Sequence, residues 1–490
     1  MTSNLLKGIE PEILWQRFYE ITRVPRPSKK ERKIVEHMKS FFNQLNIPFK
    51  EDEVGNLVAS VPASKGYENA PTVVLQGHVD MVCEKNKNKN FDFENDPIEL
   101  IRDGDWIKAD GTTLGSDNGI GVAAALAVIT DEQVIHGPIE ILLTVDEETG
   151  LTGANNLKPG FISGKILINM DSEEDGAFYI GCSGGVDTIA EFKTLYRNLP
   201  ENNIPYKLNI TGLKGGHSGL DINTGRGNAI KILARVMKKL EGLNFLLSEI
   251  EGGSLRNAIP REAEAILFME GNKYDEARSV IDQFRDQISN EFKSSDPDVK
   301  ISLEETKSDS GKVFPDEFTR KITDSLLAVP NGVIAMSQDI EGLVETSTNL
   351  ATVNITDGIL KIGTSQRSSV DSAKEYIAQS VAAVFRLAGA DVSHSDGYPG
   401  WKPNLDSNLL KISQTVFKNL FNKEPELKAI HAGLECGILE GKNPGLDMVS
   451  FGPTILGAHS PDERVSISTV GRFYQLLKGI LKEIAESSKN

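Results

Sequence analysis

Histidine and acidic residues stand at the ends of apolar segments in this chain, and their spacing suggests metal chemistry. In the segment 71–82, PTVVLQGHVDMV, a run of apolar and β-branched residues ends in His78 and Asp80. Alternate side chains of an extended strand point to one face, so this pair is expected to lie together. A metal-binding histidine usually donates its other ring N–H to an acid or a carbonyl. Composition alone gives about one His-x-acid triplet by chance, so other segments must support a metal site.

Four further segments supply residues of the same kinds. Each residue also has an ordinary explanation when it is taken alone: a helix N-cap, a solvated acidic turn or a surface histidine. Together they form a set of carboxylates and histidines without cysteine, which suits a pair of divalent ions. The residues are Asp117 in GTTLGSDNGIG, Asp146, Glu147 and Glu148 in LLTVDEETG, Asp171 in INMDSEE and His459 in GAHSPDER.

Charge balance favours two ions over one in such a site. Three carboxylate ligands and a hydroxide between the ions neutralise two divalent cations, and unbalanced charge in a partly buried cleft is costly. The mixed nitrogen and oxygen ligands predict zinc, with cobalt and manganese as alternatives.

Composition limits the possible classes of protein. A chain of 490 residues is too long for one ordinary core, so two or more domains are expected. A formal net charge of −17 disfavours nucleic acid and anionic membranes as partners. The three cysteines form no CxxC pair, which is typical of a reducing compartment. We find no signal-peptide pattern and no apolar run of about 18 residues, so a cytoplasmic protein is expected.

Strands alternate with helices in the first part of the chain, which predicts an α/β fold with a central mixed sheet flanked by helices. The segments 56–61, 71–80, 139–148 and 164–171 are predicted strands, and 117–132 is a predicted helix. A helix over 28–45 has Ser28 as its expected N-cap. Several of the strands end in acids at their C-terminal ends, where open α/β sheets tend to bind ligands.

The pattern changes near residue 187. Two β-then-α units, at 206–240 and 346–389, predict an inserted α+β domain with two similar halves. From about residue 397 the first pattern returns, with a strand at 446–452 and a closing helix at 468–486. We therefore expect a discontinuous catalytic domain, 1–186 and 397–490, and a lid and dimerisation-like domain over 187–396.

Eight segments in this order resemble the M20 family of metallopeptidases, over essentially the whole chain. Within that family the resemblance is closest to the aminoacyl-histidine dipeptidases. Each motif is weak to moderate in specificity, but the eight together are strong. They are GHVDMV, GTTLGSDNGIG, LLTVDEETG, INMDSEE, LKGGHSG, RNAIPRE, HAGLECG and GPTILGAHSPDE.

The resemblance implies a role for each matching position. Asp80 orients a ligand histidine, and Glu147 is the general base that takes a proton from a water shared by the ions and delivers it to the leaving amine. His217 in KGGHSG is the expected donor to the developing oxyanion. The implied metal ligands are His78 and Asp171 for one ion, Glu148 and His459 for the other, and Asp117 for both.

A dipeptidase must also hold the ends of its substrate. Arg367 in TSQRSS is expected to bind the C-terminal carboxylate in bidentate fashion, with Asn257 beside it. Arg256 and Arg261 flank Asn257 and are alternatives for this contact. The HAGLECG segment contributes His431 and Glu435, which either line a pocket for the histidine side chain of the substrate or form a buried loop network.

The predicted function is hydrolysis of dipeptides, with preference for Xaa-His and carnosine-like substrates. A broader di- or tripeptidase and an N-acyl-amino-acid amidohydrolase of the same family use the same metals and base, so they stay as alternatives. A two-metal phosphohydrolase lacks its phosphate cradle here, and a non-catalytic peptide-binding relative is expected to have lost the base or a ligand. The family also suggests a homodimer, and the sequence leaves open whether His217 acts in its own chain or in a partner.

Overall fold

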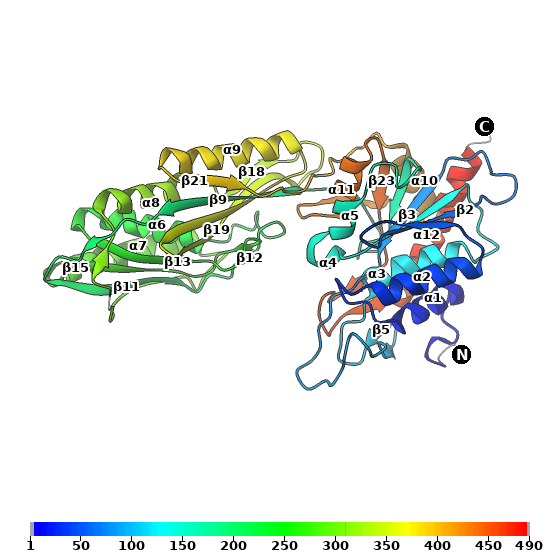
Figure 1. Cartoon of the computed structure of the whole chain (residues 1–490), viewed down its shortest axis with the longest axis horizontal. Coiled ribbons are helices and arrows are strands. Elements are labelled where there is room, and N and C mark those ends of the chain that lie inside the picture. Colours follow the sequence, from blue (N-terminus) through cyan, green and yellow to red (C-terminus); the bar gives the residue numbers. More distant parts are fainter. Residues whose placement is uncertain (1–3, 309, 488–490) are drawn as a thin grey trace. The chain divides into compact units, whose positions relative to one another are not determined.

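The computed structural model describes residues 4–308 and 310–487, and the chain divides into two compact units (Figure 1). Unit 1 contains the chain up to Gly181, Pro403–Ala429 and the chain from Leu434 onward. Unit 2 contains Cys182–Lys402 and Ile430–Gly433. His431, which the predicted boundaries assign to the first domain, therefore belongs to unit 2.

Unit 1 is built on a mixed sheet, as the alternation of strands and helices predicts. Among the described residues this sheet has eight strands, in the order β1-β2-β6-β3-β7-β23-β8-β22. The central strands β6, β3, β7 and β23 are parallel, and β3 and β6 are buried at every position. Such strands read as nearly continuous apolar runs because both of their faces are covered. The bounds are β1 Phe49–Glu51, β2 Leu57–Val61, β3 Val73–His78, β6 Ile139–Thr144, β7 Ile166–Asn169, β8 Ala177–Cys182, β22 Glu426–Ile430 and β23 Asp447–Ser450.

Helices pack against this sheet and against one another. The helix α3 has an almost entirely apolar sequence, and it contacts both β3 and α1. The pair α10 and α12 pack together, and α10 also contacts β23. The bounds are α1 Glu12–Thr22, α2 Arg32–Gln44, α3 Ser116–Val128, α4 Glu147–Gly150, α5 Thr152–Asn156, α10 Asn408–Phe421, α11 Glu435–Lys442 and α12 Ile467–Ser487.

The predicted N-cap of the second helix is wrong. The helix α2 begins at Arg32, and its N-cap residue Glu31 makes no side-chain cap. The Ser28 hydroxyl instead donates to Oδ2 of Asp80 at 2.8 Å. Ser28 therefore binds a residue that follows β3 and does not cap the helix.

A smaller sheet of unit 1 supports the loop that carries His459. Its strand order is β24-β25-β5-β4, and the 457–463 loop connects β24 to β25. The bounds are β4 Leu100–Asp103, β5 Trp106–Ala109, β24 Ile455–Leu456 and β25 Arg464–Ser466.

Unit 2 consists of two halves with the same topology. In each half the chain runs β-α-β-β-α-β, and the four strands are arranged so that the first and third lie in the middle. The first half is β11 Asn203–Thr211, α6 Ala229–Leu240, β13 Leu246–Gly252, β15 Ala263–Glu270, α7 Tyr274–Glu291 and β16 Lys300–Glu305. The second half is β9 Gly184–Lys193, α8 Asp316–Ala328, β19 Val344–Thr356, β20 Ile359–Ser368, α9 Asp371–Leu387 and β21 Asp391–His394.

The two halves of unit 2 share one sheet, and the α-helices contact its strands (Figure 1). The strands β13 and β19 meet in the middle, with Gly252 opposite Val353. The strand β18, Gly332–Met336, adds to β19. The two similar halves that the sequence predicts are therefore present as two β-α-β-β-α-β units, with the first inserted between β9 and α8 of the second.

No helix in the described part of the chain is long and apolar enough to cross a membrane.

Candidate metal centre

Three neighbouring parallel strands of unit 1 end at the edge of the sheet where the predicted ligands stand. His78 is the last residue of β3. The short helix α4 starts at Glu147, shortly after the end of β6, and Asp171 follows β7 by two residues. Since the carboxyl ends of parallel strands meet at one edge of a sheet, residues far apart in the sequence converge there.

Asp117 joins this edge through an unusual turn. It has the extended backbone angles φ −80° and ψ 115° within the first turn of α3, and the peptide bond to Asn118 is cis. The Asn118 amide donates to the carbonyl oxygen of Met170 at 2.6 Å. A Cβ atom at Gly77 would lie 2.2 Å from Oδ1 of Asn118, so this close approach to β3 requires glycine. The turn is thus fastened to both β3 and the end of β7.

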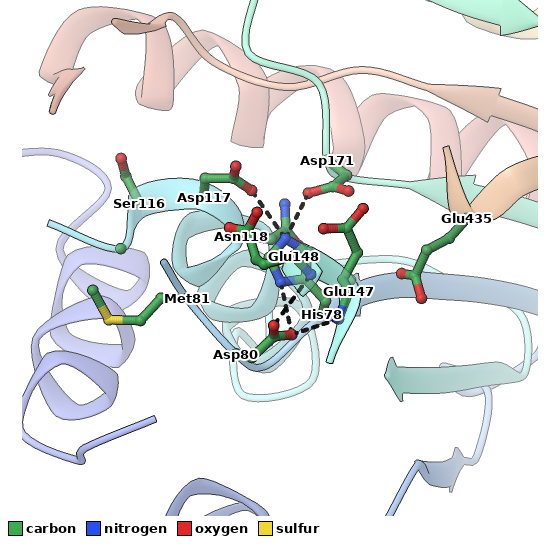
Figure 2. A network of polar contacts seen from close by, with 12 residues as sticks. His78, Asp80, Met81, Ser116, Asp117, Asn118, Glu147, Glu148, Asp171 and Glu435 are labelled. Carbon is green, nitrogen blue, oxygen red and sulfur yellow. Dashed lines mark hydrogen bonds and ion pairs between the residues drawn. The ribbon is translucent and has the colours of Figure 1, made fainter. Parts of the chain in front are cut away.

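His78 stands between two carboxylates that can share a metal ion with it. Its Nε2 atom lies 2.9 Å from Oδ1 of Asp117 and 3.3 Å from Oδ1 of Asp171. The side chain is almost completely buried, with 1% of its surface exposed. Figure 2 shows the two aspartates on the same side of the imidazole. Donor atoms of all three residues lie within 4.8 Å of one another, which fits one divalent ion.

A second group of donors uses the other oxygen of Asp117. The Nε2 atom of His459 lies 3.3 Å from Oδ2 of Asp117 and 2.9 Å from Oε2 of Glu148. These three residues also place donor atoms within 4.8 Å of one another. Because each group takes one oxygen of Asp117, the geometry fits two ions joined by a bridging carboxylate.

Asp80 connects the two groups without belonging to either. Its Oδ1 atom lies 3.3 Å from Nδ1 of His78, so the two side chains meet as their spacing predicts. The carboxylate also accepts backbone N–H bonds from Glu147 at 3.1 Å and Glu148 at 3.3 Å (Figure 2). Asp80 therefore holds the His78 ring and the first turn of α4 at once.

The carboxylates at this edge of the sheet carry more negative charge than the neighbouring side chains neutralise. Burial raises the pKa of Glu147 well above its usual value, and it raises the pKa of Asp171 to about 7 despite the attraction of His78. Hydrogen bonds that the His459 ring donates to Asp117 and Glu148 raise its pKa to about 11. Among the described residues, no lysine or arginine forms an ion pair with these carboxylates. The donors and the charge deficit both fit a pair of divalent cations.

A neighbouring acidic group has an ordinary structural explanation. Donor atoms of Glu31, Asp80 and Asp146 also lie close together and are buried. Glu31 accepts the backbone N–H of Lys29 and of Asp146, and Asp146 accepts the hydroxyls of two threonines. These donors account for the group, so we assign no ion to it.

Two residues that the sequence analysis missed brace the site. The buried Glu463 carboxylate accepts backbone N–H bonds from Leu114, Gly115 and Ser116 at 2.7–2.9 Å. The buried Arg26 guanidinium donates to the carbonyl oxygens of Val79, Asp80 and Gly115. Glu463 lies four residues after His459 in a segment that the family resemblance already covers. Arg26 stands between two prolines and gives no periodic signal.

Glu435 is the first residue of α11 and lies in unit 1, apart from the unit that contains His431. Its Oε2 atom accepts bonds from Nε2 of Gln76 at 2.6 Å and from the Thr144 hydroxyl at 2.7 Å. Thr144 is the last residue of β6 and Gln76 lies two residues before the end of β3, so both partners are on strands that lead into the metal centre. Figure 2 shows Glu435 beside Glu147.

In unit 2, His217 and Asn257 lie on adjoining short strands. The strand β12, Gly216–His217, pairs with β14, Ala258–Ile259, which directly follows Asn257. The Nδ1 atom of His217 accepts backbone N–H bonds from Gly219 at 3.2 Å and Leu220 at 3.1 Å. An imidazole that accepts at Nδ1 carries its proton on Nε2, so the outer nitrogen is a hydrogen-bond donor.

Arg367 and His431 form a second polar group in unit 2. Arg367 is 7% exposed, and its Nη1 atom donates to the Tyr398 hydroxyl at 2.9 Å. His431 meets the Ser347 hydroxyl at 2.7 Å through Nε2. Burial and the neighbouring Arg367 lower the pKa of His431 to about 3, so the ring is neutral near pH 7. No carboxylate forms an ion pair with Arg367 in the described residues.

The two flanking arginines have different surroundings. Arg256 forms an ion pair with Asp187 at 2.8 Å. Arg261 lines a cavity of about 660 Å³ in unit 2, together with Lys214 and residues of β14. Neither arginine is buried as Arg367 is.

Comparisons with known proteins agree on one family. Residues 74–483 match the model of peptidase family M20/M25/M40. The cytosol non-specific dipeptidase of Escherichia coli is 42% identical over 483 residues, which cover 98% of this chain and 99% of that protein. The crystal structure of the aminoacylhistidine dipeptidase from Vibrio alginolyticus has a TM-score of 0.92 at 40% identity and covers 98% of both chains. The aminopeptidase PepT from Bacillus cereus shares the fold, with a TM-score of 0.61 at 18% identity over 97% of this chain and 99% of that one.

Proposed function

The chain belongs to peptidase family M20/M25/M40, and we propose from this that it is a two-metal dipeptidase of the cytoplasm that prefers Xaa-His substrates. The similar protein from E. coli is named a non-specific dipeptidase, whereas the one from V. alginolyticus is named for aminoacylhistidine. Both names support a dipeptide substrate, and they differ on its C-terminal residue. Our proposal follows the second, and a broader di- or tripeptidase is the alternative.

The observation that carries this proposal is the shared Asp117 carboxylate. One oxygen lies near His78 and the other near His459, and each histidine has a further carboxylate beside it. We assign His78 and Asp171 to one ion, Glu148 and His459 to the other, and Asp117 to both. Zinc suits these ligands, and cobalt and manganese suit them as well.

The proposed mechanism rests on what the protein's own residues do. When bound, the two ions activate a water molecule and polarise the scissile carbonyl. Glu147 takes the proton from the attacking water and delivers it to the leaving nitrogen. Asp80 holds His78 in its tautomer and holds the backbone of Glu147 in place, so the base and the ligand share one support.

Residues of unit 2 are proposed to bind the substrate. His217 has its Nε2 proton free to donate to the developing oxyanion, because two backbone N–H groups occupy Nδ1. Arg367 is a buried cation without a carboxylate partner among the described residues, and this favours binding of the substrate carboxylate. Asn257 and His431 are proposed to line the same part of the substrate site. We propose further that unit 2 acts as a lid and that the protein is a homodimer.

The proposal is tested with metal-free enzyme to which zinc is returned stepwise. Hydrolysis is measured with Ala-His, β-Ala-His, Ala-Leu and N-acetyl-His, for the wild type and for Glu147→Ala. The proposal expects activity to return with zinc, to favour the two histidine dipeptides and to vanish in Glu147→Ala while its zinc content is unchanged. A matched control is Glu140→Ala, which removes a buried glutamate at the opposite end of β6.

Two outcomes contradict the proposal. Equal rates with Ala-His and Ala-Leu reject the histidine preference and favour the broader dipeptidase. Hydrolysis of N-acetyl-His without hydrolysis of the free dipeptides rejects the dipeptidase reaction in favour of an amidohydrolase.

A further inference from the structure

We propose that Glu435 binds the α-ammonium group of the substrate and so makes the enzyme require a free N-terminus. This inference rests on the proposed function, because it names the residue that separates a dipeptidase from an amidohydrolase. It gives Glu435 a different ligand from the substrate imidazole that the sequence suggested.

The Glu435 carboxylate is buried, and only one of its two oxygens is hydrogen-bonded. Its side chain is 1% exposed, and both of its hydrogen-bond donors, Gln76 and Thr144, bind to the Oε2 atom. The Oε1 atom is buried and has no hydrogen-bond partner. A buried carboxylate oxygen without a donor is costly, so this atom is a vacant acceptor.

Gln76 and Thr144 both donate to Glu435, so the carboxylate acts as an acceptor toward these two partners. The Oε1 atom of Gln76 accepts a hydrogen bond from the Asn169 amide, which orients Gln76 so that its Nε2 donates to Glu435. Glu435 is also the first residue of α11, where the positive end of the helix acts against the burial that raises the pKa of its carboxyl to about 7. The network therefore holds the side chain rigidly, with one oxygen left for an added donor.

Glu435 lies at the metal centre. It is bound by Gln76 and Thr144, which precede His78 and Glu147 in the sequence by two and three residues. Figure 2 shows its carboxylate directed to the side where Glu147 lies. In an α-dipeptide the amino nitrogen is only about 2.5 Å from the scissile carbonyl carbon, from standard bond lengths. Whatever binds the ammonium group must therefore stand close to the general base, as Glu435 does.

Among the described residues, Glu435 has no cationic side chain paired with it. No lysine or arginine forms an ion pair with it within the described ranges. The other acids of the centre are proposed as metal ligands, as the base or, in the case of Asp80, as the support of His78. Glu173 also lies near the ligands, but its side chain is exposed, whereas that of Glu435 is buried. A substrate ammonium group supplies both the missing charge and the missing donor.

The test compares Ala-His with propionyl-His, which has the same shape but lacks the amino group. The variants are Glu435→Gln, Glu173→Gln and the control Glu140→Gln, each with its zinc content and melting temperature measured. A hydrogen bond to a charged group contributes about 1.5–3 kcal/mol, or roughly 10- to 150-fold. We expect Glu435→Gln to lower kcat/KM for Ala-His by roughly that factor and to change kcat/KM for propionyl-His by less than about threefold.

Equal losses on both substrates in Glu435→Gln overturn the inference and make Glu435 a structural residue. The inference also fails if Glu173→Gln, and not Glu435→Gln, abolishes the discrimination between the two substrates. Failure of the wild type to cleave Ala-His rejects the proposed function instead, so the two failures are distinguishable.

A second variant covers the case in which Glu435→Gln does not fold. Glu435→Asp keeps the carboxylate but places it about one C–C bond closer to the backbone and so further from the substrate. It is expected to shift the ratio of kcat/KM for β-Ala-His over Ala-His upward by several-fold, because the amine of β-Ala-His extends one methylene further. An unchanged ratio contradicts the inference.

Discussion

The carboxylate of Glu463 accepts two hydrogen bonds from Ser116, one from its backbone N–H at 2.7 Å and one from its hydroxyl at 2.6 Å. Glu463 belongs to the loop that carries His459, and Ser116 precedes Asp117. One side chain therefore fixes the distance between two elements that carry proposed metal ligands.

The substitution Glu463→Gln is expected to weaken metal binding. An amide has a single acceptor oxygen, so it cannot replace a carboxylate that accepts bonds from Leu114, Gly115 and Ser116 at once. Loss of such supporting contacts typically costs about 10- to 100-fold in metal affinity. Competition with a zinc-binding dye measures the change, with Glu140→Gln as the control. Unaltered affinity in Glu463→Gln would show that the loop does not position the ligands.

The substitution Asp80→Asn is expected to lower kcat more than it changes KM. An asparagine side chain keeps the size but loses the charge that pairs with His78, and it cannot accept both backbone N–H groups of α4. We expect a loss of roughly 10- to 100-fold in kcat with Ala-His. Steady-state kinetics at measured zinc content checks this, and an equal loss caused only by a higher KM would contradict it.

The substitution Arg367→Met is expected to raise KM for dipeptides with a free carboxylate. A charged hydrogen bond contributes about 1.5–3 kcal/mol, so we expect the KM for Ala-His to rise by roughly 10- to 150-fold. The amide of Ala-His lacks the carboxylate, so the same variant is expected to cleave it almost as the wild type does. If KM rises equally for Ala-His and for its amide, Arg367 does not bind the carboxylate.

His431 is expected to make the protein less stable in mild acid. Burial, reinforced by Arg367, lowers its pKa in the folded chain to about 3, below the ordinary value of 6.5. Above pH 6.5 the ring is neutral in both states, so it causes no loss of stability. As the pH falls from 6.5 to 3, only the unfolded chain takes up the proton, and stability falls by about 1.4 kcal/mol per pH unit.

The variant His431→Gln isolates this effect, because glutamine does not titrate and can still bond to Ser347. Between pH 6.5 and 5 the wild type is expected to lose about 2 kcal/mol more unfolding free energy than the variant. Urea unfolding at the two pH values measures the difference. Parallel losses in both proteins would contradict a neutral, buried His431.

The sequence was sufficient to predict the strands that lead into the metal centre. The strands β3 and β6 are buried on both faces, so each reads as an apolar run that ends where polar side chains begin. The side-chain period of a strand also predicted the contact between His78 and Asp80. The roles of the ligands, of Glu147 and of His217 remain predictions.

Features that depend on distant contacts could not be predicted from local patterns. The helix predicted to start at Asp117 begins at Ser116, and Asp117 itself is extended because Asn118 is bound to the end of β7. Ser28 was wrongly predicted as an N-cap because its partner Asp80 is 52 residues away in the sequence, just after β3. Glu463 has its partners near residue 115, and no local spacing indicates such a contact.

The most direct test of the account is the number of zinc ions that the chain binds. Equilibrium dialysis at graded free zinc, with elemental analysis and an Ala-His assay of each sample, compares the wild type with His459→Ala. The account predicts two ions per chain in the wild type, with full activity only when both are bound, and one ion in His459→Ala. A fully active wild type with a single ion, or two ions retained in His459→Ala, would contradict it.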